Sequence, residues 1–114
     1  MRFEDLDVWQ RSARLSVEVY KHFQSSRDFG FKDQITRCSL SISSNIAEGY
    51  ERKTNKELIN FLSYAKGSCG ELRSQTYIGI EIGYIDSVLG TRWIHESEAL
   101  SRMLSSLMKA RSQF

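Results

Sequence analysis

The sequence contains no proline, only 7 glycines and 2 cysteines, and its formal net charge is +2. Without proline, no residue removes an internal hydrogen bond from a helix, so long helices can continue uninterrupted. A net charge this small does not by itself indicate nucleic-acid binding. No apolar run approaches the roughly 18 residues of a membrane-spanning helix, and the N-terminus lacks the apolar segment of a signal peptide. We therefore expect a cytoplasmic protein.

The two cysteines, Cys38 and Cys69, lie within helical patterns. Neither belongs to a Cys-x-x-Cys motif, and no histidine lies at metal-ligand spacing from either one. A cysteine on the apolar stripe of a helix behaves as a small hydrophobic residue. We predict two buried, reduced thiols with no metal, cofactor or disulfide.

Four segments carry the 3–4 spacing of apolar residues that is typical of amphipathic helices. They cover about residues 5–23, 31–49, 54–83 and 86–111. A period-two pattern at 39–43 would also suit a strand, but the chain offers no second strand to pair with it. We therefore predict one domain over residues 1–114, an all-α, antiparallel up-down-up-down four-helix bundle.

The apolar positions predict which helix faces form the core. In the first segment, we expect the inward stripe to be Leu6, Trp9, Ala13, Ser16, Tyr20 and Phe23, flanked by Val8, Leu15 and Val19. In the third segment, the expected core stripe is Leu58, Leu62, Ala65, Cys69, Leu72, Thr76 and Gly79. In the last segment it is Trp93, Ser97, Leu100, Leu104 and Leu107.

The third segment also carries a stripe of small residues, about 140° around the helix from the core stripe. Its members are Ser63, Gly67, Gly70 and Ser74. An interior glycine costs a helix roughly 1 kcal/mol relative to alanine, so two on one face suggest that a backbone or bulky side chain approaches closely. The approaching group belongs either to the same chain or to a neighbouring subunit. In the second case the stripe is an oligomer interface.

The boundary between the second and third segments is marked by a glycine and a capping pattern. Gly49 stands where the second apolar pattern stops, and we predict that it closes this helix in the left-handed conformation. Thr54 and Glu57 form a Thr-x-x-Glu capping box, which would satisfy two free amides at the start of the third helix.

A polar group surrounds this boundary. Asn45 and Glu48 share one helix face, and Arg52 and Lys53 follow in the turn, beside the positive end of the third helix. One interpretation is a site for a small anion or an RNA phosphate. In the other, Asn45 and Glu48 cap helix ends and pair with Arg52 or with neighbouring chains.

Basic residues exceed acidic ones between residues 52 and 80. Arg52, Lys53, Lys56, Lys66 and Arg73 stand against only Glu57 and Glu71. They are either a nucleic-acid surface or ordinary solvated helix faces. No catalytic constellation accompanies them, because Glu18 and His22 have no second copy as a di-iron bundle requires, and His95 lies between Ile94 and Glu96. We predict that the protein is not an enzyme.

Several motifs occur in order along almost the whole chain. They are Phe3-x-x-Leu6-x-Val8-Trp9, Val19-Tyr20, Ser44-Asn45-Ile46-Ala47-Glu48-Gly49, Arg52-Lys53, Glu57, Phe61-Leu62, Ala65-Lys66-Gly67-Ser68 and Glu71-Leu72. On these motifs the chain resembles the four-helix-bundle family of 23S rRNA intervening-sequence proteins, also labelled S23 ribosomal proteins. The family often has proline before the second helix and before Ser-Asn-Ile-Ala-Glu-Gly. Here Ser25-Ser26 and Ser43 stand in those regions, which affects loop geometry and not the expected fold.

The resemblance implies a homopentameric, barrel-like assembly around a central pore. It also implies kinship with the accessory variability protein of diversity-generating retroelements, which binds nucleic acid and a reverse transcriptase. That role is not transferred, because no reverse-transcriptase partner follows from this sequence. Two functions remain: an oligomer that binds RNA or DNA through a basic surface, and a protein-interaction scaffold whose charges only keep it in solution.

Overall fold

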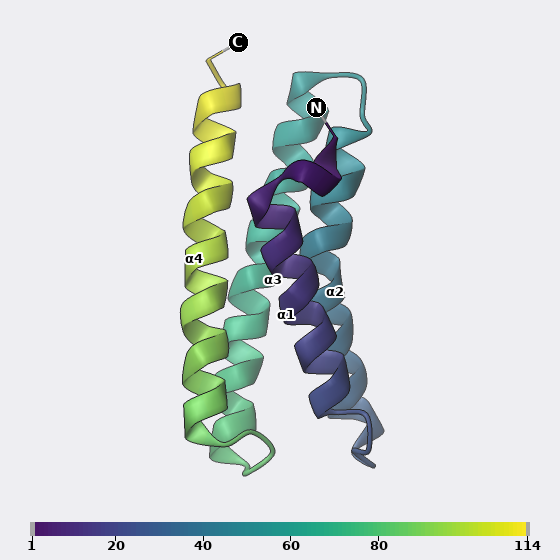
Figure 1. Cartoon of the computed structure of the whole chain (residues 1–114), viewed down its shortest axis with the longest axis vertical. Helices are drawn as coiled ribbons and strands as arrows, with labels where there is room; N and C mark the ends of the chain where they lie inside the picture. The colour runs from purple at the N-terminus through teal and green to yellow at the C-terminus, as the bar shows by residue number, and fades with distance from the viewer. Residues whose placement is uncertain (1, 114) are drawn as a thin grey trace.

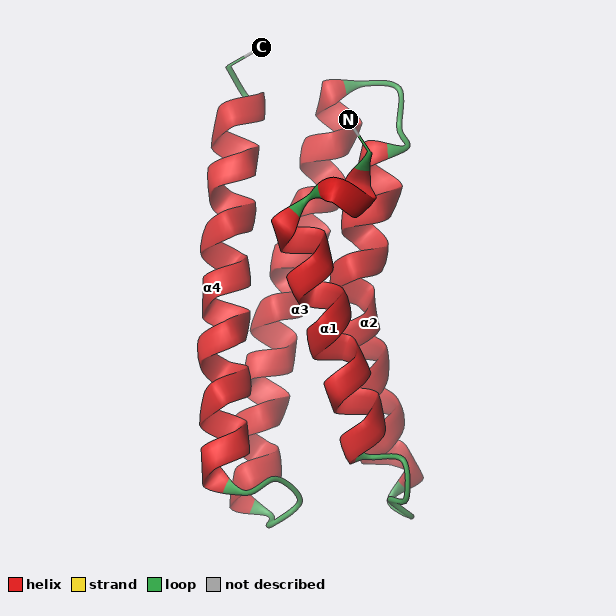
Figure 2. Ribbon diagram, viewed as in Figure 1, coloured by secondary structure: helices red, strands yellow, loops and turns green. Residues whose placement is uncertain are grey.

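The computed structural model describes residues 2–113 and consists of helices joined by short turns (Figures 1 and 2). A short 3-10 helix, η1 (Phe3–Asp5), precedes α1 (Asp7–His22), α2 (Phe29–Tyr50), α3 (Asn55–Glu81) and α4 (Ser87–Arg111). The described part of the chain contains no strand, and 39–43 lies within α2. The prediction of an all-α four-helix bundle is confirmed.

The four helices pack unequally. α3 packs extensively against both α2 and α4, whereas α1 packs mainly against α2 and only sparsely against α4. The bundle measures 46 × 21 × 20 Å, so its length is that of its longest helices. The turn between α2 and α3 and the last turn of α4 lie at the same end (Figure 1).

Polar side chains define three of the helix starts. Asp28, Thr54 and Asp86 each accept a hydrogen bond from a backbone amide three residues later, at 3.1, 3.2 and 2.9 Å. The capping box forms only in part, because the Glu57 carboxylate accepts from the Thr54 hydroxyl, at 2.9 Å, and not from its amide. Each cap satisfies an amide that the helix itself leaves without a partner.

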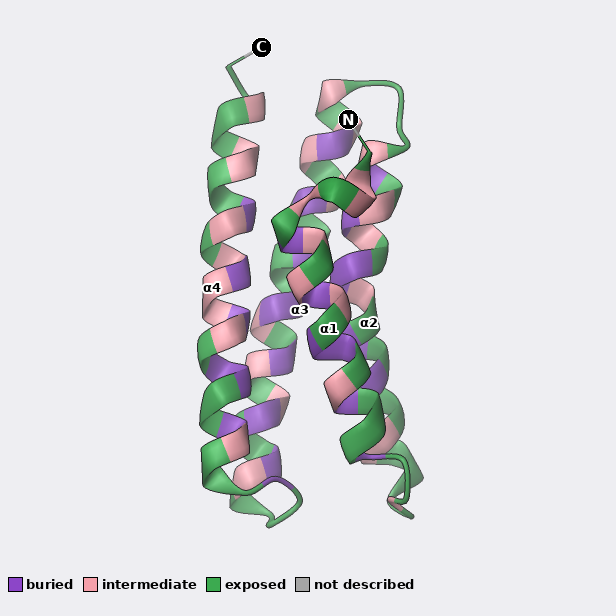
Figure 3. Ribbon diagram, viewed as in Figure 1, coloured by how far each residue is buried: buried purple, intermediate pink, exposed green. Residues whose placement is uncertain are grey.

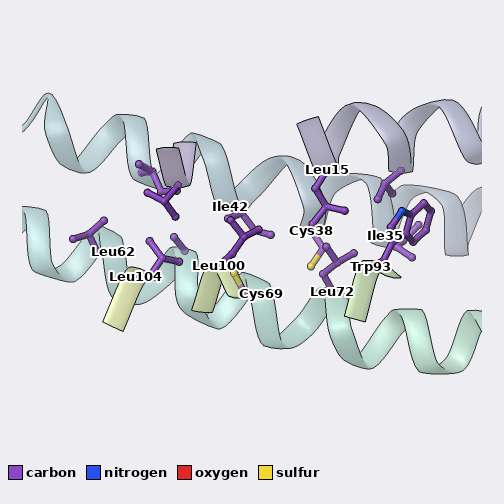
Figure 4. Packing of buried hydrophobic residues seen from close by; sticks show 14 of the residues in the cluster. Leu15, Ile35, Cys38, Ile42, Leu62, Cys69, Leu72, Trp93, Leu100 and Leu104 are labelled. Carbon is purple, nitrogen blue, oxygen red and sulfur yellow. The ribbon is translucent and has the colours of Figure 1, made fainter. Parts of the chain in front are cut away.

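The core lies along the axis of the bundle (Figure 4). Every residue of the predicted α3 stripe is buried: Leu58, Leu62, Ala65, Cys69, Leu72, Thr76 and Gly79. In α4, Trp93, Ser97, Leu100 and Leu104 are buried and Leu107 is half-buried. In α2 the buried stripe includes Ile35, Cys38, Ile42 and Ile46. The 3.6-residue period therefore located the inner faces of α3 and α4 correctly.

The prediction for α1 is confirmed for Ser16 and Phe23, but the expected flanking residues Val8, Leu15 and Val19 make up most of its buried face. The buried residues are Val8, Ser12, Leu15, Ser16 and Val19, together with Phe23 just beyond the helix. Trp9 and Ala13 are only half-buried, and Tyr20 is 41% exposed.

The prediction for Gly49 was also wrong. Gly49 lies inside α2 and is buried, and the glycine with a left-handed conformation is Gly83, with a φ of 83°, at the end of α3. A Cβ atom on Gly49 would lie 3.0 Å from both Leu58 Cδ1 and Phe61 Cβ. Gly49 therefore lies at a close contact between α2 and the first turns of α3.

The stripe of small residues faces away from the chain. A Cβ atom on Gly67 or Gly70 would meet no other heavy atom within 4 Å, apart from its own helix backbone and chain neighbours. Ser63, Gly67 and Ser74 are exposed, and Gly70 is half-buried. Close packing within the chain does not explain these glycines, so this interpretation is wrong. A role in contact between subunits stays a prediction.

Candidate functional site

Arg52 is the most heavily engaged residue of the basic set. Its guanidinium lies 3.0 Å from Glu48 Oε1 and 3.7 Å from Glu57 Oε2, and it stacks 4.8 Å from the centre of the Phe61 ring. Two carboxylates therefore balance its charge. Arg52 joins the end of α2 to the first turn of α3, and the interpretation that pairs Glu48 with Arg52 agrees with this geometry.

The Asn45 side chain hydrogen-bonds within its own helix. Its Nδ2 donates to the Ser41 carbonyl oxygen at 2.8 Å and lies 2.9 Å from Ser41 Oγ. The Ser41 hydroxyl in turn lies 2.9 Å from the Ser68 hydroxyl of α3. The motif residues Asn45, Glu48 and Gly49 thus make their contacts within α2, with the turn that follows it and with the first turns of α3, respectively.

A small polar pocket opens where α2, α3 and α4 meet. It has a volume of about 290 Å³, and its lining includes Tyr50, Arg52, Lys53, Asn55 and Arg111. The Arg111 guanidinium lies 5.8 Å from the centre of the Tyr50 ring, and Asn55 donates to the Arg111 carbonyl oxygen. Sequence reasoning missed Arg111, although the antiparallel bundle necessarily brings the end of α4 to the start of α3.

The five predicted basic residues are spread along α3 and the turn before it. Lys53 and Lys56 are exposed at the start of α3, beside Arg52. Lys66 is exposed and Arg73 half-buried farther along α3, seven residues apart, which places them about 10 Å from one another along the axis. Within residues 2–113, Lys53, Lys56, Lys66 and Arg73 form no ion pair with a carboxylate.

Two ion pairs between α1 and α4 were not predicted from the sequence. Arg11 of α1 hydrogen-bonds Glu96 of α4 at 2.9 Å, and Arg92 of α4 hydrogen-bonds Glu18 of α1 at 2.6 Å. The bonds from Arg92 and then Trp93 lower the pKa of the Glu18 carboxyl. These pairs span a polar hollow of about 580 Å³ between α1 and α4. They link α1 to α4, two helices that pack only sparsely against one another.

Cys38 and Cys69 are buried, and the Cys38 thiol donates to the Ser68 carbonyl oxygen at 3.2 Å. Burial raises the pKa of each thiol to about 12. No group of three or more metal-ligating side chains occurs among the described residues. None of the described helices is long and apolar enough to cross a membrane.

We expect both thiols to react slowly with a thiol reagent at pH 8, since burial restricts access and keeps the reactive thiolate scarce. In denaturant both should react at the rate of free cysteine. Stopped-flow labelling with an aromatic disulfide, with and without guanidinium, measures the two rates. Rapid labelling of either cysteine in the native protein would contradict the buried placement.

The profile of the 23S rRNA-intervening sequence proteins matches residues 4–106. The chain belongs to this family. It is also similar to the crystal structure of a protein of unknown function from the S23 ribosomal protein family of Bacteroides thetaiotaomicron VPI-5482. That comparison has a TM-score of 0.83 and 24% identity, and it covers 90% of this chain and 98% of the other. At this identity the likeness shows the fold alone. A comparison with curated proteins finds no match.

Proposed function

We propose that this intervening-sequence protein is a non-enzymatic bundle that self-associates, as a pentamer, and binds RNA or DNA with little sequence preference. Nucleic-acid binding is supported by one observation above all: Lys53, Lys56 and Lys66 are exposed and have no carboxylate partner within residues 2–113. Exposed lysines attract phosphates as point charges. A chain with a net charge of +2 gives only a weak field by itself.

Self-association strengthens this field. Five copies would repeat the lysine pair at the start of α3 around one assembly, and linked sites bind a single polyanion more tightly than separate ones. Binding would then depend on phosphate contacts, so affinity would fall steeply with added salt.

The second candidate function is a protein-interaction scaffold. It is favoured by the large apolar side chains that lie exposed on the bundle, among them Val17, Tyr20 and Leu40 on α1 and α2. Exposed apolar groups of this size, when they gather, mark surfaces that bind other proteins. In this case the lysines would contribute only to solubility.

Replacing Lys53 and Lys56 together by alanine should lower the affinity for unrelated RNA and DNA sequences about tenfold, at roughly 50 mM salt. The slope of log K against log salt should decrease by about 2, one for each lost phosphate contact. Fluorescence anisotropy with two unrelated oligonucleotides, over a salt series, measures both effects.

The matched control is Arg52→Ala. Because Arg52 is already paired with Glu48 and Glu57, this change should reduce the melting temperature and leave the affinity nearly unchanged. If the wild-type assembly binds neither RNA nor DNA at low salt, the nucleic-acid proposal fails and the scaffold function remains.

A further inference from the structure

The hollow between α1 and α4 has the size of a small-molecule site. Its volume is about 580 Å³, and sites that bind small molecules occupy about 300–1,000 Å³. The buried Leu15 and the half-buried Ala99 contribute the apolar part of its lining. Figure 3 shows exposed and half-buried positions on α1 and α4 next to the buried ones, and the charged lining residues come from these positions.

The lining of the hollow carries more positive than negative groups. It includes three arginines, one histidine and two glutamates: Arg11, Arg14, Arg92, His95, Glu18 and Glu96. Arginines already engage both glutamates. Arg11 donates from Nε to Glu96 at 2.9 Å, and Arg92 donates through both terminal nitrogens to Glu18, at 2.6 and 3.2 Å. Within each pair the charges balance, so the remaining positive groups of the lining face no free carboxylate there.

Arg14 and His95 are these remaining groups. Arg14 follows Arg11 by three residues and precedes Glu18 by four, which places all three on one face of α1. His95 follows Arg92 by three residues, on the corresponding face of α4. Both side chains are exposed, and neither forms a hydrogen bond or an ion pair within residues 2–113. The hollow therefore presents two side-chain donors without an acceptor, next to two ion pairs that are already formed.

We propose that the α1–α4 hollow binds the phosphate group of a phosphorylated molecule. Arg14 and His95 donate to the phosphate oxygens, and the planar guanidinium of Arg14 matches two of them at once. Arg92 adds a donor, because its Nε–H has no acceptor in the described part of the chain. A phosphate monoester carries nearly two negative charges at pH 7, so it balances more of the unpaired positive charge than a single carboxylate does. Leu15 and Ala99 contact the group that carries the phosphate.

This site is separate from the lysine pair of the proposed function. Lys53 and Lys56 lie at the start of α3, and neither lines the hollow. The inference goes beyond the proposed function and does not depend on it. Replacing both lysines by alanine should therefore leave phosphate binding in the hollow unchanged.

Isothermal titration calorimetry with glycerol phosphate and with glycerol tests the site. Glycerol phosphate should bind the wild-type protein with a Kd of about 1 mM or lower, and glycerol should not bind. Arg14→Ala and His95→Ala should each weaken binding about tenfold, because each removes a hydrogen bond to a charged group. Both side chains are exposed, so circular dichroism should show an intact bundle in each variant.

The matched control is Arg27→Ala. Arg27 lies in the turn between α1 and α2, is exposed and unpaired among residues 2–113, and does not line the hollow. Its replacement removes the same charge and should leave the affinity for glycerol phosphate unchanged. The assignment is wrong if the wild type does not bind glycerol phosphate, or if Arg27→Ala weakens binding as much as Arg14→Ala does. Either result leaves the lysine pair of the proposed function untouched.

The phosphate group belongs either to the end of a nucleic acid or to a small molecule. Fluorescence anisotropy with one RNA oligonucleotide, carrying either a terminal phosphate or a terminal hydroxyl, separates the two sources. A preference for the phosphorylated end that Arg14→Ala removes would identify a nucleic-acid end as the ligand. Equal affinity for the two oligonucleotides, together with binding of glycerol phosphate, would assign the hollow to a small phosphorylated molecule.

Discussion

Replacing Leu72 by alanine should lower the free energy of unfolding by about 3 kcal/mol, within the range of about 2–5 kcal/mol that such truncations cost in well-packed cores. Leu72 is 0% exposed and lies at the centre of α3, the helix with the most extensive contacts. Its side chain points into the interior among those of Leu15, Ile35 and Cys38 (Figure 4). The substitution removes methyl groups and leaves a cavity, because rigid helices on several sides cannot close the gap.

Urea denaturation at matched protein concentration measures this loss, since self-association would shift the apparent stability. Val88→Ala is the control, because Val88 is 80% exposed. It should change the free energy of unfolding by less than about 0.5 kcal/mol. Equal losses in the two variants would mean that Leu72 is not the core residue that the structure describes.

The fold could be predicted because the spacing of apolar residues within each long helix is visible in the local sequence. The α3 stripe from Leu58 to Gly79 keeps its 3–4 spacing over 22 residues, and every member is buried. The capping box at Thr54 marked the start of α3 from side-chain chemistry alone. These features depend on neighbours in sequence, so one sequence is sufficient to recognise them.

The rotation of α1 could not be predicted in the same way. The helix carries two apolar stripes of comparable strength, and the larger side chains, Trp9 and Tyr20, favoured the wrong one. Which stripe is buried depends on the helices that pack against α1, and this information is not local. The stripe that includes Trp9 and Tyr20 is left only partly covered by the described residues.

The candidate site, like the fold, could be predicted only in part from the sequence. Sequence spacing placed Arg52 beside Lys53 and Lys56, but only the structure shows that Arg52 is held by Glu48, Glu57 and the Phe61 ring. A long side chain can pair across a turn or point into solvent, and the sequence does not distinguish the two. The lysines, not the arginine of the shared motif, are therefore the better candidates for phosphate contacts.

Gly49→Val should destabilise the bundle by about 2–3 kcal/mol, as overpacking of a close contact does. A Cβ atom at this position already lies 3.0 Å from Leu58 Cδ1 and Phe61 Cβ, and valine adds two methyl groups beyond it. The Leu58 side chain can rotate, but Phe61 Cβ is fixed to the α3 backbone, so α2 and α3 must separate. Gly49→Ala should give a smaller loss in the same direction, since only the first carbon enters the contact.

Gly67→Val provides the matched comparison. It makes the same change in α3, where a Cβ atom meets nothing within 4 Å, so it should leave the free energy of unfolding unchanged or raise it by about 0.4 kcal/mol, the difference in helix propensity. Chemical denaturation of the three variants below the concentration of assembly measures the effects on the single chain. If Gly49 closed α2 as a left-handed cap, alanine and valine would both be costly through backbone strain alone, and by similar amounts. The graded losses expected here, small for alanine and large for valine, would show instead that α3 needs the space above Gly49.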